Sequence, residues 1–269
     1  MIKRNYHTHT LYCDGKDTPE EMVLSAIDKG FSTLGFSGHS PLEGTDWGMN
    51  GDRLNKYKNE ILSLKEKYKD KIEILCGIEQ DYYSGNSLEG YDYIIGSVHC
   101  LKVSDGYLPL DDSADILKEG IVKYFGSDPV KLAKCYYETV SNVVNKTGCQ
   151  IIGHFDLITK FDDTAHIFDT ANAEYIESAK TAIDKLSRTG ALFEVNTGAM
   201  TRRLKSLPYP AKDLLEYIRN CGCDVVINSD CHDKNYLDFG FDTALSLIKE
   251  CGFERIAYIS EGGIKYTDI

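Results

Sequence analysis

The sequence lacks the features that mark membrane and secreted proteins. Nowhere in its 269 residues does an apolar run of about 18 residues occur, which excludes a membrane-spanning helix. The opening residues, MIKRNYHTHT, contain no apolar stretch of the kind found in signal peptides and no small-residue cleavage site. We therefore expect a cytoplasmic protein with no membrane partner.

Cysteine spacing that would indicate a disulfide framework or a cysteine-based zinc site is also absent. The chain has nine cysteines, an odd number, and no two form a CxxC pair. The CGC sequence at 221–223 does not have zinc-knuckle spacing. Reduced thiols are the expected state for such cysteines in a protein that is not secreted.

Basic residues are too few for a protein that wraps nucleic acid. The chain has 30 Lys and Arg against 42 Asp and Glu, a formal net charge of -12. Pro- or Ser-rich linkers, low-complexity tracts and internal repeats are missing as well. We expect a single domain over residues 1–269, with no nucleic-acid partner and no obligate protein partner.

The sequence does contain a recurring unit, in which a helix pattern ends at a glycine and a short β-type run follows. This occurs at four places, Gly30, Gly148, Gly190 and Gly222. A capping box formed by Thr18 and Glu21 predicts the start of one helix, and Asp128 with Pro129 predicts the start of another that ends before Gly148. Alternating helices and strands predict an α/β fold with a parallel sheet.

The predicted strands are apolar at consecutive positions, as expected for parallel strands covered on both faces. The runs are IEILCGIE, YDYIIGSVH, IIGH, LFEVN and DVVIN. This pattern alone allows an open sheet or a closed barrel. The unusual polar residues fall at the C-terminal ends of these runs, where a barrel gathers its functional side chains, and this favours the barrel.

Six of the seven histidines lie at predicted strand ends, and three carboxylates accompany them. The nine candidate metal ligands are His7, His9, Asp14, His39, Glu79, His99, His154, Asp230 and His232. His7 and His9 are two residues apart and would share one face of an extended strand, as would Asp230 and His232. Only His166, in a polar stretch, is expected at the surface.

Nine ligands are too many for one ion, because an ion takes about four. Two or three divalent ions are expected, and imidazole with carboxylate suits Zn, Mn or Fe. Three such ions, three carboxylates and a bridging hydroxide leave a formal charge of about +2, which a phosphate ester dianion would balance. The pattern thus favours a small-molecule phosphate ester as substrate.

At these residues the sequence resembles the polymerase and histidinol phosphatase (PHP) superfamily, and in particular its stand-alone histidinol-phosphate phosphatases. The resemblance is carried by HTHTLYCDG at 7–15, SGHSPL at 37–42, GIEQDY at 77–82, SVHC at 97–100, GHFDL at 153–157 and NSDCH at 228–232. It implies a distorted (β/α)7 barrel with a trinuclear site at the C-terminal ends of the strands. It also implies hydrolysis of L-histidinol phosphate, in histidine biosynthesis.

The resemblance further implies how the ligands divide among three ions. His7, His9, Glu79 and Asp230 would hold the first ion, and Glu79 would bridge to a second ion held with His99 and His154. Asp14, His39 and His232 would hold the third; a solvated loop aspartate is the alternative for Asp14. Asp230, Glu79 and His99 are expected to act in catalysis, as a hydroxide that bridges two ions attacks phosphorus.

Several residues near the ligands are candidates for binding substrate. Lys160, Arg202 and Arg203 follow predicted strand ends and could hold the phosphate, or they could be solvated surface residues. Acidic loop residues could select the amine and imidazole of histidinol; the candidates are Glu43, Asp46, Asp81 and Asp111. Trp47 could cover the site from a lid or anchor a loop. Cys13, Cys100 and Cys231 neighbour ligands but are expected to point away and pack.

Two other functions are compatible with these residues. A PHP-type phosphodiesterase, exonuclease or phosphotyrosine phosphatase would use the same metal site on another substrate. A metal-stabilised binding module without activity would keep the fold but cleave no phosphate ester.

Overall fold

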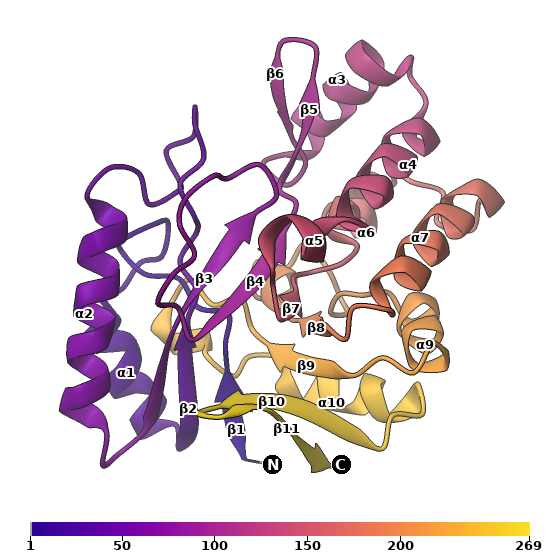
Figure 1. Cartoon of the computed structure of the whole chain (residues 1–269). Helices are drawn as coiled ribbons and strands as arrows, with labels where there is room; N and C mark the ends of the chain where they lie inside the picture. The colour runs from indigo at the N-terminus through magenta and orange to yellow at the C-terminus, as the bar shows by residue number, and fades with distance from the viewer. Residues whose placement is uncertain (1) are drawn as a thin grey trace.

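A sheet of seven parallel strands forms the centre of the computed structural model, which describes residues 2–269 (Figure 1). The strands are β1 (Lys3–Asn5), β2 (Phe31–Phe36), β3 (Glu73–Asp81), β4 (Tyr93–Ser97), β7 (Ile151–Ile152), β8 (Leu192–Asn196) and β9 (Val225–Asn228). Their order in the sheet follows the chain, and each adjacent pair is parallel. All seven C-terminal ends therefore lie at the same end of the sheet.

The last strand returns to the first and nearly closes a barrel. The His9 amide donates to the Cys231 carbonyl at 2.8 Å, and the Cys231 amide donates to the His7 carbonyl at 3.0 Å. Closer to the N-terminal ends of the strands, a side chain replaces the backbone pairing, because the Asn228 Oδ1 accepts from the Tyr6 amide at 2.8 Å. The (β/α)7 barrel expected from the sequence is confirmed.

Helices cover the outside of the barrel (Figure 1). They are α1 (Pro19–Asp28), α2 (Arg53–Tyr68), α3 (Ala114–Phe125), α4 (Pro129–Val140), α5 (Val143–Thr147), α6 (Asp162–Ala165), α7 (Ala173–Leu186), α8 (Gly198–Thr201), α9 (Lys212–Asn220) and α10 (Phe241–Glu250), with 3-10 turns η1 (Leu157–Thr159) and η2 (Lys234–Tyr236). Within residues 2–269, none of them combines the length and apolar character that crossing a bilayer requires.

The helix ends explain how the chain returns to the sheet. Thr18 caps α1 and forms the expected capping box with Glu21. Gly30, Gly148, Gly190 and Gly222 all have positive φ, between 66° and 75°, which turns the chain into the next strand at no steric cost.

The helix predicted from Asp128 to Gly148 is instead two helices, and that prediction was wrong in its length. α4 ends at Val140, and the Ser141 hydroxyl donates back to the Glu138 carbonyl at 2.7 Å. A serine hydroxyl bonded in this way competes with the helical ladder and favours a break. α5 then runs to the predicted end, with Gly148 as its left-handed C-cap.

Two antiparallel hairpins complete the fold. β5 (Cys100–Val103) and β6 (Gly106–Pro109) project beyond the C-terminal ends of the strands, whereas β10 (Arg255–Ser260) and β11 (Gly263–Asp268) cross the opposite end, near both chain termini (Figure 1). Apolar side chains of the strands pack there against Ala257 and Ile259 of β10; they are Tyr6, Leu75, Tyr93, Ile95, Ile151, Leu192 and Val226. This layer seals one end of the barrel and leaves the other for polar groups.

Candidate metal centre

The structure brings all nine predicted ligands together at the C-terminal ends of the strands. They divide into four overlapping groups whose potential ligand atoms lie within 4.8 Å of one another. His7 and His9 follow β1, His39 follows β2, Glu79 belongs to β3, His99 follows β4, His154 follows β7, and Asp230 and His232 follow β9. Asp14 comes from the turn after His9. Residues separated by more than 200 positions thus meet because parallel strands end side by side.

Glu79 lies at the centre of the cluster, completely buried, with imidazoles around both of its oxygens. Its Oε2 faces His39 Nδ1 at 2.9 Å, His7 Nε2 at 3.1 Å and His9 Nε2 at 3.5 Å. Its Oε1 faces His154 Nε2 at 2.9 Å and His99 Nε2 at 3.2 Å. A carboxylate that has imidazole nitrogens near each of its two oxygens can bridge two cations.

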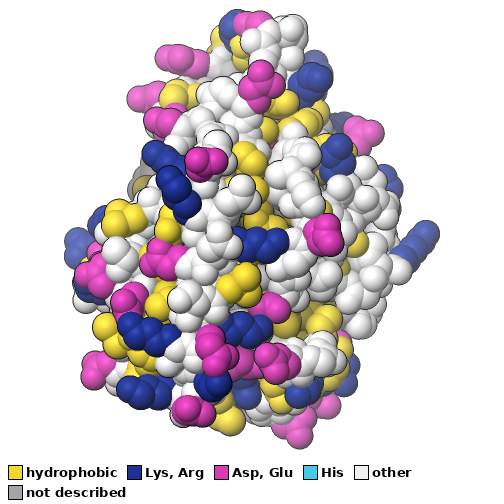
Figure 2. All heavy atoms as spheres, turned by 60° about the vertical axis from the view of Figure 1, so that its left-hand side comes forward, with side chains coloured by type: hydrophobic (Ala, Val, Ile, Leu, Met, Phe, Trp, Pro, Cys, Tyr) yellow, Lys and Arg dark blue, Asp and Glu magenta, His cyan; other side chains and the backbone are white. Residues whose placement is uncertain are grey.

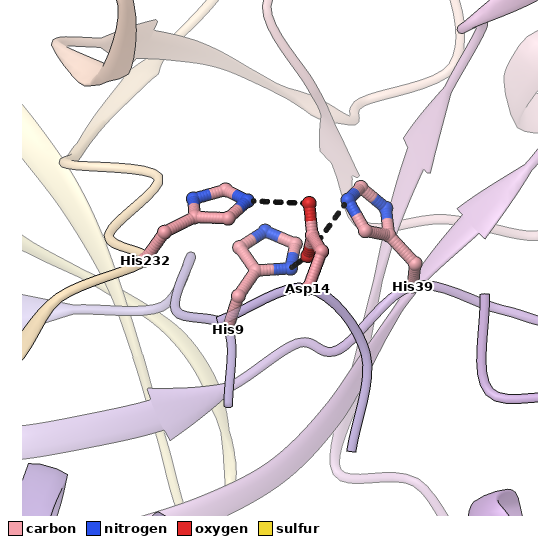
Figure 3. A group of neighbouring side chains, drawn as sticks. All are labelled: His9, Asp14, His39 and His232. Atoms are coloured by element: carbon pink, nitrogen blue, oxygen red, sulfur yellow. Dashed lines mark hydrogen bonds and ion pairs between the residues drawn. The ribbon is translucent and has the colours of Figure 1, made fainter. Parts of the chain in front are cut away.

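Asp14 gathers a second set of imidazoles on the solvent side (Figure 3). Its Oδ2 lies 3.1 Å from His232 Nε2, and its Oδ1 lies 3.6 Å from both His39 Nε2 and His9 Nδ1. The rings of His9 and His232 stack with centroids 4.0 Å apart. The Nδ1 of His232 lies 2.9 Å from the Asp230 carbonyl oxygen, which favours a proton on Nδ1 and leaves Nε2 free to bind a cation.

The carboxylate of Asp230 approaches the cluster from an unusual backbone conformation. Its Oδ1 lies 3.2 Å from His9 Nε2 and 3.6 Å from His7 Nε2. Its φ is +48°, in the left-handed region that non-glycine residues seldom occupy. Gly198 makes room for it, because a Cβ at that position would lie 2.8 Å from the Asp230 side chain. The surrounding structure therefore holds this side chain in a strained, fixed place.

The donor set fits divalent transition metals. Four atoms that face one another are buried without a hydrogen-bond partner in residues 2–269: His7 Nε2, His9 Nε2, His39 Nδ1 and Glu79 Oε2. Unpaired buried polar atoms are costly unless a ligand satisfies them. Ligand atoms each about 2.0 Å from a tetrahedral ion lie about 3.3 Å apart, which is close to the separations around Glu79.

The electrostatics of the cluster point the same way. Burial alone would raise the pKa of Glu79, but His7 and His39 outweigh it and hold that pKa well below its usual value. Burial and the neighbouring imidazoles of His232 and His39 lower the pKa of His9 to about 3, so it is neutral, as a metal ligand must be. Burial opposes the charged form of His99, yet Glu79 and Asp81 raise its pKa to about 10. A protonated imidazole can take the place of a cation beside Glu79, and an ion bound there would have to displace that proton.

Sequence reasoning missed Glu194, a fully buried residue in β8 that contacts two of the predicted ligands. Its Oε1 lies 2.6 Å from His7 Nδ1, and its Oε2 accepts from the His154 amide at 2.8 Å. Asn228 and Asn196 each donate to it at 2.9 Å. A carboxylate on the far nitrogen of a ligating histidine fixes the ring and its tautomer. The available signal was an acidic residue inside the apolar run LFEVN.

Asp81 has a different place from the one expected. We expected an acidic loop residue that selects substrate, but Asp81 is the buried last residue of β3. Its Oδ2 accepts from the His99 amide at 3.2 Å and lies 3.3 Å from His99 Nδ1. Asp81 pairs with Ser97, the last residue of β4, so it lies beside the start of the segment that carries His99 and can orient its ring.

A cavity opens from the metal cluster to the surface. Its inner part is lined by cluster residues together with Lys160, Arg202 and Tyr209. The outer part, about 580 Å³, adds Trp47 and the acidic residues Glu43, Asp46 and Asp112, while Asp111 lines both parts. Lys160 is buried, and its Nζ donates to Asp111 Oδ2 at 2.9 Å and to the Asp111 carbonyl at 2.7 Å.

The structure does not bring Arg203 into either part of this cavity. Arg202 lines both parts and places its Nη2 3.0 Å from His232 Nδ1. The next residue has a left-handed backbone, with φ of +57°, and an exposed side chain. Two consecutive arginines therefore leave the chain in different directions, which their adjacency in the sequence could not reveal.

The structure tests several expectations about other residues that the sequence analysis singled out. Trp47 is partly buried, and its ring packs edge-on against His39 and His99 at centroid distances of 4.8 and 5.6 Å. His166 is exposed, as expected. Cys231 points away, toward the Asp233 carbonyl.

Cys13 departs from the expected orientation. Its sulfur lies 3.5 Å from His9 Nδ1 because the chain turns at residues 11–14 instead of staying extended. Cys100 is buried at the start of β5. In the described part of the chain, no cysteine belongs to the four groups of possible metal ligands.

Known proteins share this arrangement of the chain. The chain is 28% identical to the "Probable histidinol-phosphatase" of Schizosaccharomyces pombe, over 95% of this chain and 89% of that one. It is 26% identical to the histidinol-phosphatase of Bacillus subtilis, over 91% of this chain and 99% of the relative. A solved structure of histidinol phosphate phosphatase from Lactococcus lactis, in complex with zinc, L-histidinol and phosphate, aligns with a TM-score of 0.74 at 23% identity, over 98% of each chain.

The family assignment follows from a longer match. The sequence model of the PHP domain matches residues 5–198, which include β2 to β8 and seven of the nine clustered residues. Because this match covers well over half of the chain, the protein belongs to the PHP domain family.

Proposed function

We propose that the protein is a metal-dependent phosphomonoesterase that hydrolyses L-histidinol phosphate to L-histidinol and phosphate. The observation that carries the proposal is the buried Glu79 carboxylate, with imidazoles around both oxygens. Three of these imidazoles line a cavity together with Lys160 and Arg202. The two relatives named above are called histidinol-phosphatases, and this chain aligns with nearly their whole length. The lactococcal protein was solved in complex with zinc, L-histidinol and phosphate. This supports the same substrate here.

The proposed cofactor is a set of three divalent ions, Zn, Mn or Fe. In the division that the family resemblance implies, the residues for the first ion are His7, His9, Glu79 and Asp230; those for the second are Glu79, His99 and His154; those for the third are Asp14, His39 and His232. All of them belong to the four overlapping groups of possible ligands. His9 lies between the first and third positions, because its two ring nitrogens face Asp230 and Asp14.

The bound ions, Asp230 and the two cationic side chains of the cavity would have different roles in hydrolysis. Ions bound here would supply Lewis acidity: they would lower the pKa of a water molecule and would neutralise the phosphate oxygens. Asp230, whose pKa His7 and His9 hold well below its usual value against the effect of burial, stays ionised and can orient that water. Lys160 and Arg202, which line the inner cavity, would bind the phosphate oxygens.

Removal of two ligands tests the proposal. We expect His99→Asn and Asp230→Asn to reduce phosphate release from L-histidinol phosphate to background while the circular dichroism stays nearly unchanged. His166→Asn is the matched control, because His166 is exposed and outside the cluster. The wild-type protein should contain about three transition-metal ions per chain, and a chelator should abolish its activity. Turnover that survives both substitutions would contradict the proposal.

A substrate panel separates this function from the alternatives. Histidinol phosphate, a short oligonucleotide and a phosphotyrosine peptide should be compared with the same metal-loaded sample. On the face drawn in Figure 2, basic side chains are interspersed with acidic ones and do not form a continuous basic surface. This arrangement and the net charge of -12 favour the small ester over nucleic acid. If metal removal unfolds the protein but the metal-loaded protein cleaves none of the three substrates, the protein is a binding module.

A further inference from the structure

Tyr209 differs from every other buried tyrosine among residues 2–269 in having no hydrogen-bond partner for its hydroxyl. The hydroxyls of Tyr6, Tyr57, Tyr93 and Tyr136 each donate to a backbone carbonyl, Tyr68 donates to Glu20, and Tyr137 and Tyr175 pair with each other. Tyr209 is only 2% exposed. A buried hydroxyl without a partner is unfavourable, and a phenylalanine would fill the same space without that cost.

The position of Tyr209 connects this hydroxyl with the candidate active site. Its ring lies 6.5 Å from the ring of His154, centroid to centroid, and it lines the inner cavity with Lys160, Arg202 and Asp230. Two backbone hydrogen bonds of 2.9 Å between Asn196 and Tyr209 attach it to the end of β8. The side chain is therefore presented to the cavity by the barrel itself, not by a free loop.

We propose that the Tyr209 hydroxyl donates a hydrogen bond to a non-bridging oxygen of the substrate's phosphoryl group. This inference rests on the proposed phosphatase function and adds a neutral donor to the two cations, Lys160 and Arg202, that line the same inner cavity. The ester's organic part would extend the other way, toward the outer cavity at Trp47. A fixed donor that faces the phosphoryl oxygens stabilises the charge that they carry during transfer.

The hydroxyl is suited to donate a hydrogen bond and not to transfer its proton. Burial, followed by the nearby carboxylates of Asp156 and Asp111, raises the pKa of Tyr209 well above its usual value. It therefore stays protonated at neutral pH. A phosphate dianion, which offers only acceptors, is the complementary partner for such a group.

Tyr209→Phe tests this inference in the zinc-loaded protein, with inorganic phosphate as the binding probe. We expect kcat/KM for histidinol phosphate to fall about 10- to 100-fold and the inhibition constant of phosphate to rise several-fold. Zinc content and the thermal midpoint should match the wild type. Tyr136→Phe is the control, because it removes an equally buried hydroxyl that donates to the Phe155 carbonyl at 3.0 Å. This control should leave phosphate inhibition unchanged.

The outcomes separate this inference from the proposed function. Unchanged kcat/KM and phosphate inhibition in Tyr209→Phe would overturn the role of the hydroxyl, as would a loss of zinc from that variant. If the wild type binds phosphate but does not hydrolyse histidinol phosphate, the proposed function fails, whereas direct phosphate binding by Tyr209→Phe still decides the inference. A wild type that neither hydrolyses the ester nor binds phosphate would overturn both.

Discussion

The Oε1 atom of Glu194 lies 2.6 Å from Nδ1 of His7, and both side chains are completely buried. The other nitrogen of the same imidazole, Nε2, faces Glu79 at 3.1 Å. The Glu194 carboxylate thus fixes the imidazole through Nδ1, while Nε2 is directed at the cluster. The same carboxylate accepts from the His154 amide at 2.8 Å, so a single residue of β8 fixes parts of two other strand ends.

Glu194→Gln should weaken zinc binding by about 10- to 100-fold, because an amide accepts through one oxygen only and holds the imidazole less firmly. Competition with a chromophoric chelator measures the affinity directly. Glu138→Gln, at an exposed position on α4, makes the same chemical change away from the cluster and should have no effect. Equal zinc affinities for Glu194→Gln and the wild type would show that His7 needs no such support.

The sequence predicts which side chains cluster, because most of them lie at the C-terminal ends of strands. His39, His154 and Asp230 stand directly after apolar runs, and parallel strands bring such positions together in any closed barrel. The glycine C-caps and the capping box of α1 are local, so their sequence signals suffice. Clustered positions that depend only on strand ends could therefore be predicted.

Roles that depend on side-chain direction could not be predicted. Glu194 lies within its strand, and only the barrel's curvature shows that it points inward, two residues before Asn196 on the same face. Asp81 was expected in a loop because the apolar run IEILCGIE ends at Glu79, whereas β3 continues through Asp81. Arg203 is separated from Arg202 by a left-handed backbone. The β10–β11 hairpin packs through contacts between distant segments, which the hydrophobic periodicity of the sequence does not predict.

Asp238 should make the stability of the fold depend on pH. Its Oδ2 lies 2.6 Å from Lys3 Nζ, and its Oδ1 lies 3.3 Å from Lys29 Nζ. Burial opposes ionisation, but these two lysines lower the pKa of Asp238 below its usual value. The ion pairs therefore stabilise the fold fully above the unfolded-state pKa of about 3.9, and this contribution is lost as the pH falls through the lower folded-state pKa.

Urea unfolding of Asp238→Asn measures this contribution. We expect a loss of less than about 1 kcal/mol in the free energy of unfolding at pH 7, since solvent screens these partly exposed pairs. The difference from wild type should shrink as the pH falls from about 3.9 toward the lowered pKa of Asp238 in the folded state. Asp105→Asn, at an exposed pair with Lys123, is a control for the loss of a surface charge. A difference that grows in acid would have the wrong sign for this account.

Arg202 and Arg203 form a natural test of phosphate binding, because they are adjacent and chemically identical. The Nη2 of Arg202 lies 3.0 Å from His232 Nδ1, yet that nitrogen also lies 2.9 Å from the Asp230 carbonyl, to which its proton is best donated. The guanidinium therefore gains no acceptor from the imidazole, and it makes no ion pair with a carboxylate among residues 2–269. It lines the cavity as a cation that an anionic substrate would satisfy.

Arg202→Met should therefore lower kcat/KM for histidinol phosphate by about 100-fold, whereas Arg203→Met should leave it within about twofold of wild type. Both variants lose one positive charge, so a general effect of net charge would reduce both rates equally. Arg202→Lys should recover part of the loss, because an ammonium keeps the charge but not the two-pronged hydrogen bonding. Steady-state kinetics with zinc content measured on each sample gives the comparison. Equal rates for Arg202→Met and Arg203→Met would mean that the phosphate is held by other groups of the cavity.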